Sequence, residues 1–410
     1  MLIIFDVIVL LMIKMDVKRY KSFFTPFSII STIYLILINA DNLLVSHIYK
    51  YDRVNSYSLS ILLLIFTILF CVSYLFSSLF VASTGKYHFS CENRLNNNTI
   101  KFLYYVGLLS YFISLALCIQ RFGIKNIKGN AFGIFAHLSS LSFIFAPLLI
   151  KASKSVKSKI FTLVSIVAMF AIAFMFGGKY LICINAIYIG LFLLTSNKYK
   201  FKKLLKLAFI ILICGLIVFI IIYCLIPLLR HEVNNFNDTF SFAVEHFFYY
   251  LLSPIIGNNY ALSHLCPDGV EKVFTVPLNI LKAAFRLADY VNPIYPFIFK
   301  YSSTGNTNVA GLLGESVYCL GLFFGIVYIV FCFCLIYAIY LSFRINGRYK
   351  ITTNYLLAVL SFSFFGNFFT LSGIILPLIF MFVFETYIQT IGRKRVAKRI
   401  SSDNFKLERQ

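Results

Sequence analysis

The segment TGNTNVAGLLGESVYCLGLFFG, residues 304–325, lies where a polar stretch of the chain gives way to a long apolar run. The polar stretch extends from about Leu228 to Gly311, and on both sides of it apolar runs alternate with short connectors. Polar and charged groups are costly inside a bilayer unless they serve a purpose. We therefore expect the chemistry of this chain to be concentrated in the polar stretch.

The composition predicts a membrane protein. Of the 410 residues, 60% are hydrophobic and 13% are charged, which excludes an ordinary soluble domain. The apolar runs lack the alternating pattern of barrel strands, so helices are expected. The predicted fold class is an all-α, polytopic membrane protein with about 11 transmembrane helices and one large extracytoplasmic loop. The predicted spans lie near residues 2–13, 23–45, 57–82, 101–120, 132–150, 160–176, 180–195, 204–227, 312–341, 352–370 and 373–391.

The basic residues predict the orientation of these spans. Most of the 37 Lys and Arg residues fall in alternate connectors, and short basic loops stay cytoplasmic. This places the C-terminus in the cytoplasm and the long loop outside, which is the periplasm if the membrane is a bacterial inner membrane. The expected organisation is N-terminal helices in 1–227, the loop in 228–311, C-terminal helices in 312–391 and a basic tail in 392–410.

The net charge of +22 follows from this topology and does not indicate a nucleic-acid partner. The sequence RKRVAKR, residues 393–399, is interpreted as an anchor on anionic membrane lipids. The chain has no Walker loop, no dinucleotide fingerprint and no HExxH motif. Its histidines are not spaced as zinc ligands. We therefore expect neither a cofactor nor a metal ion.

Two groups of polar residues stand at the outer ends of predicted spans. Lys179 follows two glycines at the turn of a predicted helical hairpin, where it either contacts a phosphate or snorkels to the interface. Arg230, His231 and Glu232 follow the span that ends near residue 227. Together they would clamp and protonate an anionic group, or they form a solvated helix end.

Further candidates lie in amphipathic stretches and in another outer loop. Residues 240–257, FSFAVEHFFYYLLSPIIG, contain Glu245 and His246, and we expect an interfacial or re-entrant helix there. Its aromatic residues would anchor it at the headgroups or stack on sugar rings. Arg286 lies in a second amphipathic stretch, where surface pairing is the plainer explanation, and Arg121 lies in an outer loop.

The order of these parts resembles the bacterial O-antigen polymerase family (Wzy-type). The resemblance rests on residues 176–179, FGGK, on the large loop before the third-last span, and on residues 305–309, GNTNV, followed by Glu315. The sequence 361–370, SFSFFGNFFT, is also similar to the family's penultimate span. The chain departs from the family pattern in having Lys179 where Arg is frequent and Glu315 where Asp is frequent.

The resemblance implies a glycosyltransferase that joins repeat units linked to undecaprenyl pyrophosphate, which would be its donor and acceptor. A chain-length regulator is a further expected partner. Glu315, Glu232 and His231 are the candidate catalytic residues; for Glu315 the open roles are general base and orienting partner of a cation. The expected substrate-binding residues, several of them cations for the pyrophosphate, are Arg121, Lys179, Arg230, Glu245, His246, Arg286 and Asn308.

Two other functions agree with the composition. A lipid-linked oligosaccharide flippase would have similar spans, but the long loop and the absence of two related halves disfavour it. An interaction or chain-length scaffold without chemistry would not explain the polar residues in the membrane.

The predicted topology is tested by fusing alkaline phosphatase, which is active only outside the cytoplasm, to truncated chains. We expect activity from a fusion after Asn258 and none from a fusion after Arg399, because basic segments are retained inside. The reverse pattern would contradict every outer-face assignment above.

Overall fold

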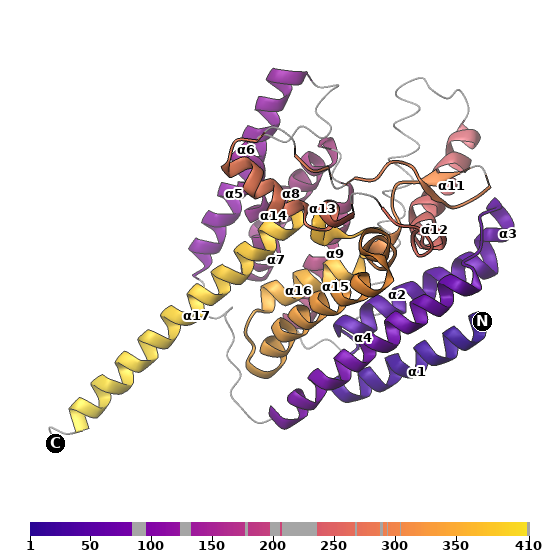
Figure 1. Cartoon of the computed structure of the whole chain (residues 1–410). Helices are drawn as coiled ribbons and strands as arrows, with labels where there is room; N and C mark the ends of the chain where they lie inside the picture. The colour runs from indigo at the N-terminus through magenta and orange to yellow at the C-terminus, as the bar shows by residue number, and fades with distance from the viewer. Residues whose placement is uncertain are drawn as a thin grey trace. The chain divides into compact units, whose positions relative to one another are not determined.

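The computed structural model describes residues 1–83, 96–123, 133–176, 179–196, 206, 236–266, 269–287, 290–292, 294–303 and 305–407. These residues form helices and one two-stranded hairpin (Figure 1). The chain is an all-α membrane protein, as its composition predicts.

The chain folds into two compact units, which we describe separately. The first unit contains Met1–Ser73, Leu194–Phe333 and Leu360–Thr370, and the second contains Tyr74–Leu193, Cys334–Val359 and Leu371–Gln410. Both units are therefore assembled from separate parts of the sequence. The division into N-terminal helices, a large loop, C-terminal helices and a basic tail stays a prediction.

The elements of the first unit are α1 (Leu2–Tyr20), α2 (Pro26–Ala40), the π-helix η1 (Asp41–Val45), α3 (Ser46–Tyr49), α11 (Phe236–Ile256), α12 (Asn258–Ala261), α13 (Gly269–Val273), α14 (Thr275–Ala284), β1 (Phe299–Lys300), β2 (Asn306–Thr307) and the 3-10 helix η4 (Phe368–Thr370). The second unit has α5 (Asn97–Phe122), α6 (Gly133–Leu138), α7 (Ser140–Ala152), α8 (Val156–Met175), α9 (Lys179–Ser196), α16 (Lys350–Ser361), which begins there, and α17 (Ser372–Leu407). The helices α4 (Ser56–Ser83) and α15 (Gly311–Asn346) run from the first unit into the second.

A buried carboxylate joins the first helices of the first unit. Asp16 on α1 is 1% exposed and accepts hydrogen bonds from the hydroxyls of Thr25, Ser28 and Ser73, of which the Ser28 bond is 2.6 Å long. Thr25 also caps α2, because its side chain accepts from the Ser28 amide at 3.0 Å. One carboxylate thus holds α1, the start of α2 and α4 together.

Helix α15 begins and bends at glycines. Gly311 has φ of 67°, a value that favours glycine, and an added Cβ there would meet the Tyr34 hydroxyl at 2.6 Å. Gly321 interrupts the helix with φ of 75° and ψ of 170°. The part of α15 before Gly321 is therefore a separate short piece, held by a bond from the Leu312 amide to the Ser363 carbonyl at 2.7 Å.

The short hairpin packs on this first piece of α15. Phe299 of β1 pairs with Thr307 of β2 in antiparallel register. Phe299 is fully buried, and its ring meets the Tyr318 ring edge-on at 5.2 Å. The buried core of this region comprises Ala261, Val273, Tyr295, Phe299, Ala310, Tyr318 and Cys319. The hairpin therefore has a fixed position within the first unit.

In the second unit, close helix packing depends on a small residue. An added Cβ at Gly107 of α5 would collide with the backbone amide of Ser142 on α7, so a larger residue would push the helices apart. The start of α16 is capped by Glu385 of α17, which accepts from the amides of Ile351 and Thr352, each at 3.0 Å.

Among the described residues, seven helices are long and apolar enough to cross a membrane. They are Pro26–Tyr49, Ser56–Phe80, Asn97–Phe122, Ile134–Ala152, Val156–Met175, Gly311–Asn346 and Ser372–Thr390. Each corresponds to a predicted span. The predicted span at 180–195 is a shorter apolar helix, Tyr180–Ser196, and the one at 204–227 lies outside the described residues apart from Lys206.

Two predicted spans have a different structure. The span predicted near 2–13 is the longer helix α1, in which charged residues interrupt the apolar sequence. The span predicted over 352–370 is wrong as a single helix, because α16 ends at Ser361 and the chain turns before η4. Ser363 caps this turn by donating to the Leu360 carbonyl at 2.7 Å. A total of eleven spans and a large outer loop remain predictions.

The role of Asp16 is tested by replacing it with Ala. Three buried hydroxyls would lose their acceptor, so we expect the free energy of unfolding to fall by about 1–3 kcal/mol or more. Thermal unfolding of the purified protein in detergent measures the change. Asp6→Ala is the control, because Asp6 is half-buried and accepts one bond, from Asn39. Equal melting temperatures for the two variants would contradict this role.

Candidate functional site

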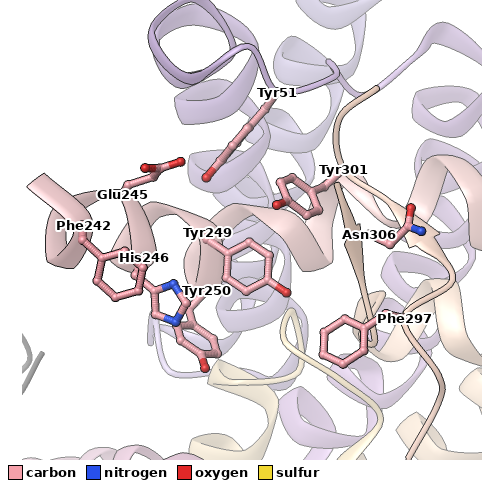
Figure 2. A pocket seen from close by; sticks show the side chains of 9 residues that line it. All are labelled: Tyr51, Phe242, Glu245, His246, Tyr249, Tyr250, Phe297, Tyr301 and Asn306. Atoms are coloured by element: carbon pink, nitrogen blue, oxygen red, sulfur yellow. The ribbon is translucent and has the colours of Figure 1, made fainter. Parts of the chain in front are cut away.

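The first unit contains a pocket of about 330 Å³ whose lining is mainly aromatic (Figure 2). Three segments far apart in the sequence supply its walls: the connector after α3, helix α11, and the chain around the hairpin. The lining residues are Tyr51, Phe242, Glu245, His246, Tyr249, Tyr250, Phe297, Tyr301 and Asn306.

One face of α11 carries a row of aromatic and imidazole rings. Phe242, His246, Tyr249 and Tyr250 are spaced by four, three and one residues, which places them on the same side of a helix. The His246 ring stacks on Phe242 at 4.9 Å between centroids and on Tyr249 at 5.5 Å. It meets Tyr250 edge-on at 4.9 Å. The imidazole is thus held by aromatic rings within the pocket wall.

A second wall joins the connector after α3 to the hairpin. The Asp52 amide donates to the Tyr301 carbonyl at 2.9 Å, which ties residue 51 to residue 301. The rings of Tyr51 and Tyr301 meet edge-on at 5.2 Å, and Tyr301 meets Tyr249 at 5.0 Å. Figure 2 shows Tyr301 lying between the other two tyrosines. The three phenols therefore belong to one packed group.

The connector is also fixed to α12. The backbone amide of Asn55 donates to the side-chain oxygen Oδ1 of Asn259 at 3.0 Å. The side-chain nitrogen Nδ2 of Asn259 donates to the Arg53 carbonyl at 2.8 Å. These reciprocal bonds hold the connector in place without any contact to the pocket interior. The position of Tyr51 is thus determined before a ligand binds.

The electrostatics of the pocket are those of a neutral to negative site. Burial raises the pKa of the Tyr51 and Tyr301 phenols, and the charge of Glu245 raises the pKa of both further. Burial also raises the pKa of Tyr249. These phenols therefore stay protonated at neutral pH and can donate hydrogen bonds. The described residues that line the pocket include no Lys or Arg.

Glu315 does not line this pocket, and its side chain is 5% exposed. One carboxylate oxygen accepts from the Ala310 amide at 3.2 Å and the other from the Asn367 amide at 2.9 Å. Both segments lead to the pocket: residues 305–310 carry Asn306, and the turn before Asn367 carries Phe365, whose ring stacks with Tyr250 at 6.1 Å. Glu315 therefore positions two segments that support the site.

The structure brings some of the predicted site residues together. Glu245 and His246 line the same pocket, and Asn308 is half-buried between β2 and α15, in the segment that Glu315 holds. Glu315 accepts hydrogen bonds from two backbone amides, a bracing role that was not predicted from the sequence. Its predicted roles, general base and orienting partner of a cation, stay predictions.

Other predicted residues are not part of this pocket. Arg286 is exposed with φ of 55°, two residues beyond the end of α14, so it is not part of that helix. Arg121 is exposed at the end of α5 in the second unit. Lys179 begins α9 in that unit, and its side chain is not among those described. Arg230, His231 and Glu232 lie outside the described residues.

The sequence analysis missed most of the pocket. Asn306 belongs to the motif 305–309 but was not predicted as a site residue. Tyr51, Phe297 and Tyr301 were not singled out, and no local pattern distinguishes them from the other aromatic residues of the chain. The ring face of α11 could have been found from its helical spacing, because residues 242, 246, 249 and 250 share one face.

Flat rings, neutral phenols, an amide and one carboxylate around a cavity suit a ligand that has both apolar faces and hydroxyl groups. Sugar rings have these two properties: their C–H faces pack on aromatic rings and their hydroxyls bond to polar groups. Among the described residues no group of three or more His, Cys, Asp or Glu side chains is placed to hold a metal ion.

The bracing of two backbone segments by Glu315 is tested with Glu315→Gln. A Gln amide would direct N–H groups at one of the two backbone amides, so we expect the free energy of unfolding to fall by about 1–3 kcal/mol. Thermal unfolding of the purified variant measures this, with Glu271→Gln on the exposed face of α13 as the control. Wild-type stability in Glu315→Gln would argue against this bracing role.

Comparison with known proteins gives one match. Residues 128–391 match a family described as "Family of unknown function (DUF6337)". No curated protein and no solved structure matches the chain. The matched region contains the whole pocket except Tyr51. Because the match covers well over half of the sequence, the chain belongs to the DUF6337 family.

Proposed function

We propose that this protein is a polysaccharide polymerase: a glycosyltransferase in the bacterial inner membrane that joins lipid-linked repeat units on the periplasmic face. The observation that carries the proposal is the aromatic pocket of the first unit, which has the properties of a sugar site in a multi-pass membrane protein. The resemblance of the sequence to the O-antigen polymerase family adds the reaction and the lipid carrier.

In the proposed reaction, a hydroxyl of the acceptor repeat unit attacks the anomeric carbon of the donor sugar. The new glycosidic bond forms as the bond between the anomeric carbon and the undecaprenyl pyrophosphate breaks, and the bonding electron pair leaves with the pyrophosphate. The hydroxyl proton passes to a general base. Glu245 and His246 line the pocket and are the described side chains best placed for this task.

The leaving pyrophosphate needs fixed cations, because negative charge develops on its oxygen. The described pocket lining supplies none, so the predicted cations must come from elsewhere. Arg230 precedes α11 by only a few residues in the sequence, which makes it the first candidate. Its assignment, and those of His231 and Glu232, rest on the sequence alone.

A strain that lacks this chain distinguishes the proposal from a flippase. If the chain is a polymerase, the lipopolysaccharide should carry a single repeat unit on its core, because units are still exported but not joined. If it is a flippase, the core should carry no unit at all. A normal ladder of chain lengths would reject both functions.

The pocket itself is tested by restoring the chain with variants of Tyr249. Tyr249→Ala removes a ring that would pack on the sugar. The lost packing corresponds to about 1.5–3 kcal/mol, which would lower the rate roughly ten- to hundredfold. Tyr249→Phe keeps the ring and should retain most of the ladder. Gel profiles of the lipopolysaccharide, together with blots of protein level, give the result.

Tyr57→Ala is the matched control, because Tyr57 is an exposed tyrosine in the first turn of α4 that does not line the pocket. Its ladder should equal that of the wild type. A full ladder from Tyr249→Ala at normal protein level would remove the pocket from the reaction.

A further inference from the structure

We propose that the pocket selects its sugar by charge, so that it binds uncharged sugars and rejects sugars that carry a carboxylate. The inference rests on the proposed function, because it takes the pocket to be a sugar site. It adds the class of sugar that the site accepts.

The first support is the charge of the lining. Glu245 is the one Asp, Glu, Lys or Arg side chain among the described residues that line the cavity. It acts on the opposite wall, because its charge contributes to the raised pKa of both Tyr51 and Tyr301. A carboxylate that entered between these residues would meet the same repulsion.

The second support is that the cations nearest the lining in the described part of the sequence are engaged elsewhere or lie outside the cavity. Arg53 follows Tyr51 by two residues, but its guanidinium bonds to the His47 ring at 2.7 Å. Lys272 donates to the carbonyls of Asn292 at 3.0 Å and Ile294 at 3.3 Å. Lys300 is exposed beside Tyr301 and does not line the pocket.

The third support is the nature of the donors. A bound carboxylate is held in proteins by Arg, Lys or several converging backbone amides, because such charge-assisted bonds offset its desolvation. The pocket offers phenols, the His246 imidazole and one amide side chain, Asn306, which suit hydroxyl groups. A carboxylate that entered the pocket would therefore lose its hydration without gaining charge-assisted hydrogen bonds in return.

The experiment compares two ligands of nearly equal shape, methyl β-glucoside and methyl β-glucuronide. Saturation-transfer NMR measures their binding to the full-length protein in nanodiscs of zwitterionic lipid at pH 8, where an imidazole with its ordinary pKa of about 6.5 is neutral. We expect the glucuronide to bind about 3- to 10-fold more weakly than the glucoside at low salt. The difference should narrow as salt is raised, because charges near solvent are screened.

Glu245→Gln removes the charge and keeps the size of the side chain. We expect the Glu245→Gln variant to bind the glucuronide more tightly than the wild type does and to bind the glucoside equally well. The two ligands should then have equal affinities. Glu271→Gln removes an exposed carboxylate outside the pocket and should preserve the difference.

The outcomes separate this inference from the proposed function. Equal binding of both ligands to the wild type, or an unchanged difference in affinity in Glu245→Gln, would overturn the charge selection. Neither result would contradict the proposed polymerase function, which the lipopolysaccharide profiles test. Absence of glucoside binding, or binding that survives Tyr249→Ala, would show that the pocket is not a sugar site and would overturn both.

Discussion

The bridge that Glu315 forms between two backbone amides is the interaction on which the site depends. Its carboxylate joins the amide of Ala310, five residues before it, to the amide of Asn367, fifty-two residues after it. All three residues are buried, so neither water nor a mobile side chain replaces these bonds. Through this bridge the start of α15 fixes both the segment that carries Asn306 and the turn that carries Phe365 against Tyr250.

Buried carboxylates serve the same purpose elsewhere in the chain. Asp16 collects three hydroxyls from α2 and α4 and their connectors, and Glu385 receives the first amides of α16. In each case a buried ionisable group is matched to donors that belong to other segments. From the sequence alone, buried carboxylates of this kind are candidates for functional residues. In the structure, their hydrogen bonds connect helices.

The pocket differs from these networks because its polar groups face a cavity. Rings from α11 form one wall, and tyrosines from two remote segments form the other. Its phenols are held by ring packing and backbone bonds, so the site is formed in the absence of a ligand. A preformed site loses less entropy when a flexible ligand binds. The DUF6337 family match includes almost all of this region.

The sequence by itself determined that the chain is an all-α membrane protein, because apolar runs of sufficient length form helices in any bilayer. It also identified Glu245, His246 and Glu315 as candidates, since charged and polar residues in such a chain are few. It did not show that α16 ends at Ser361, because that turn depends on bonds to α15. Nor did it show the pairing of Tyr51 with Tyr301, or the backbone partners of Glu315. Contacts between residues far apart in sequence leave no periodic pattern, so only the tertiary structure decided them.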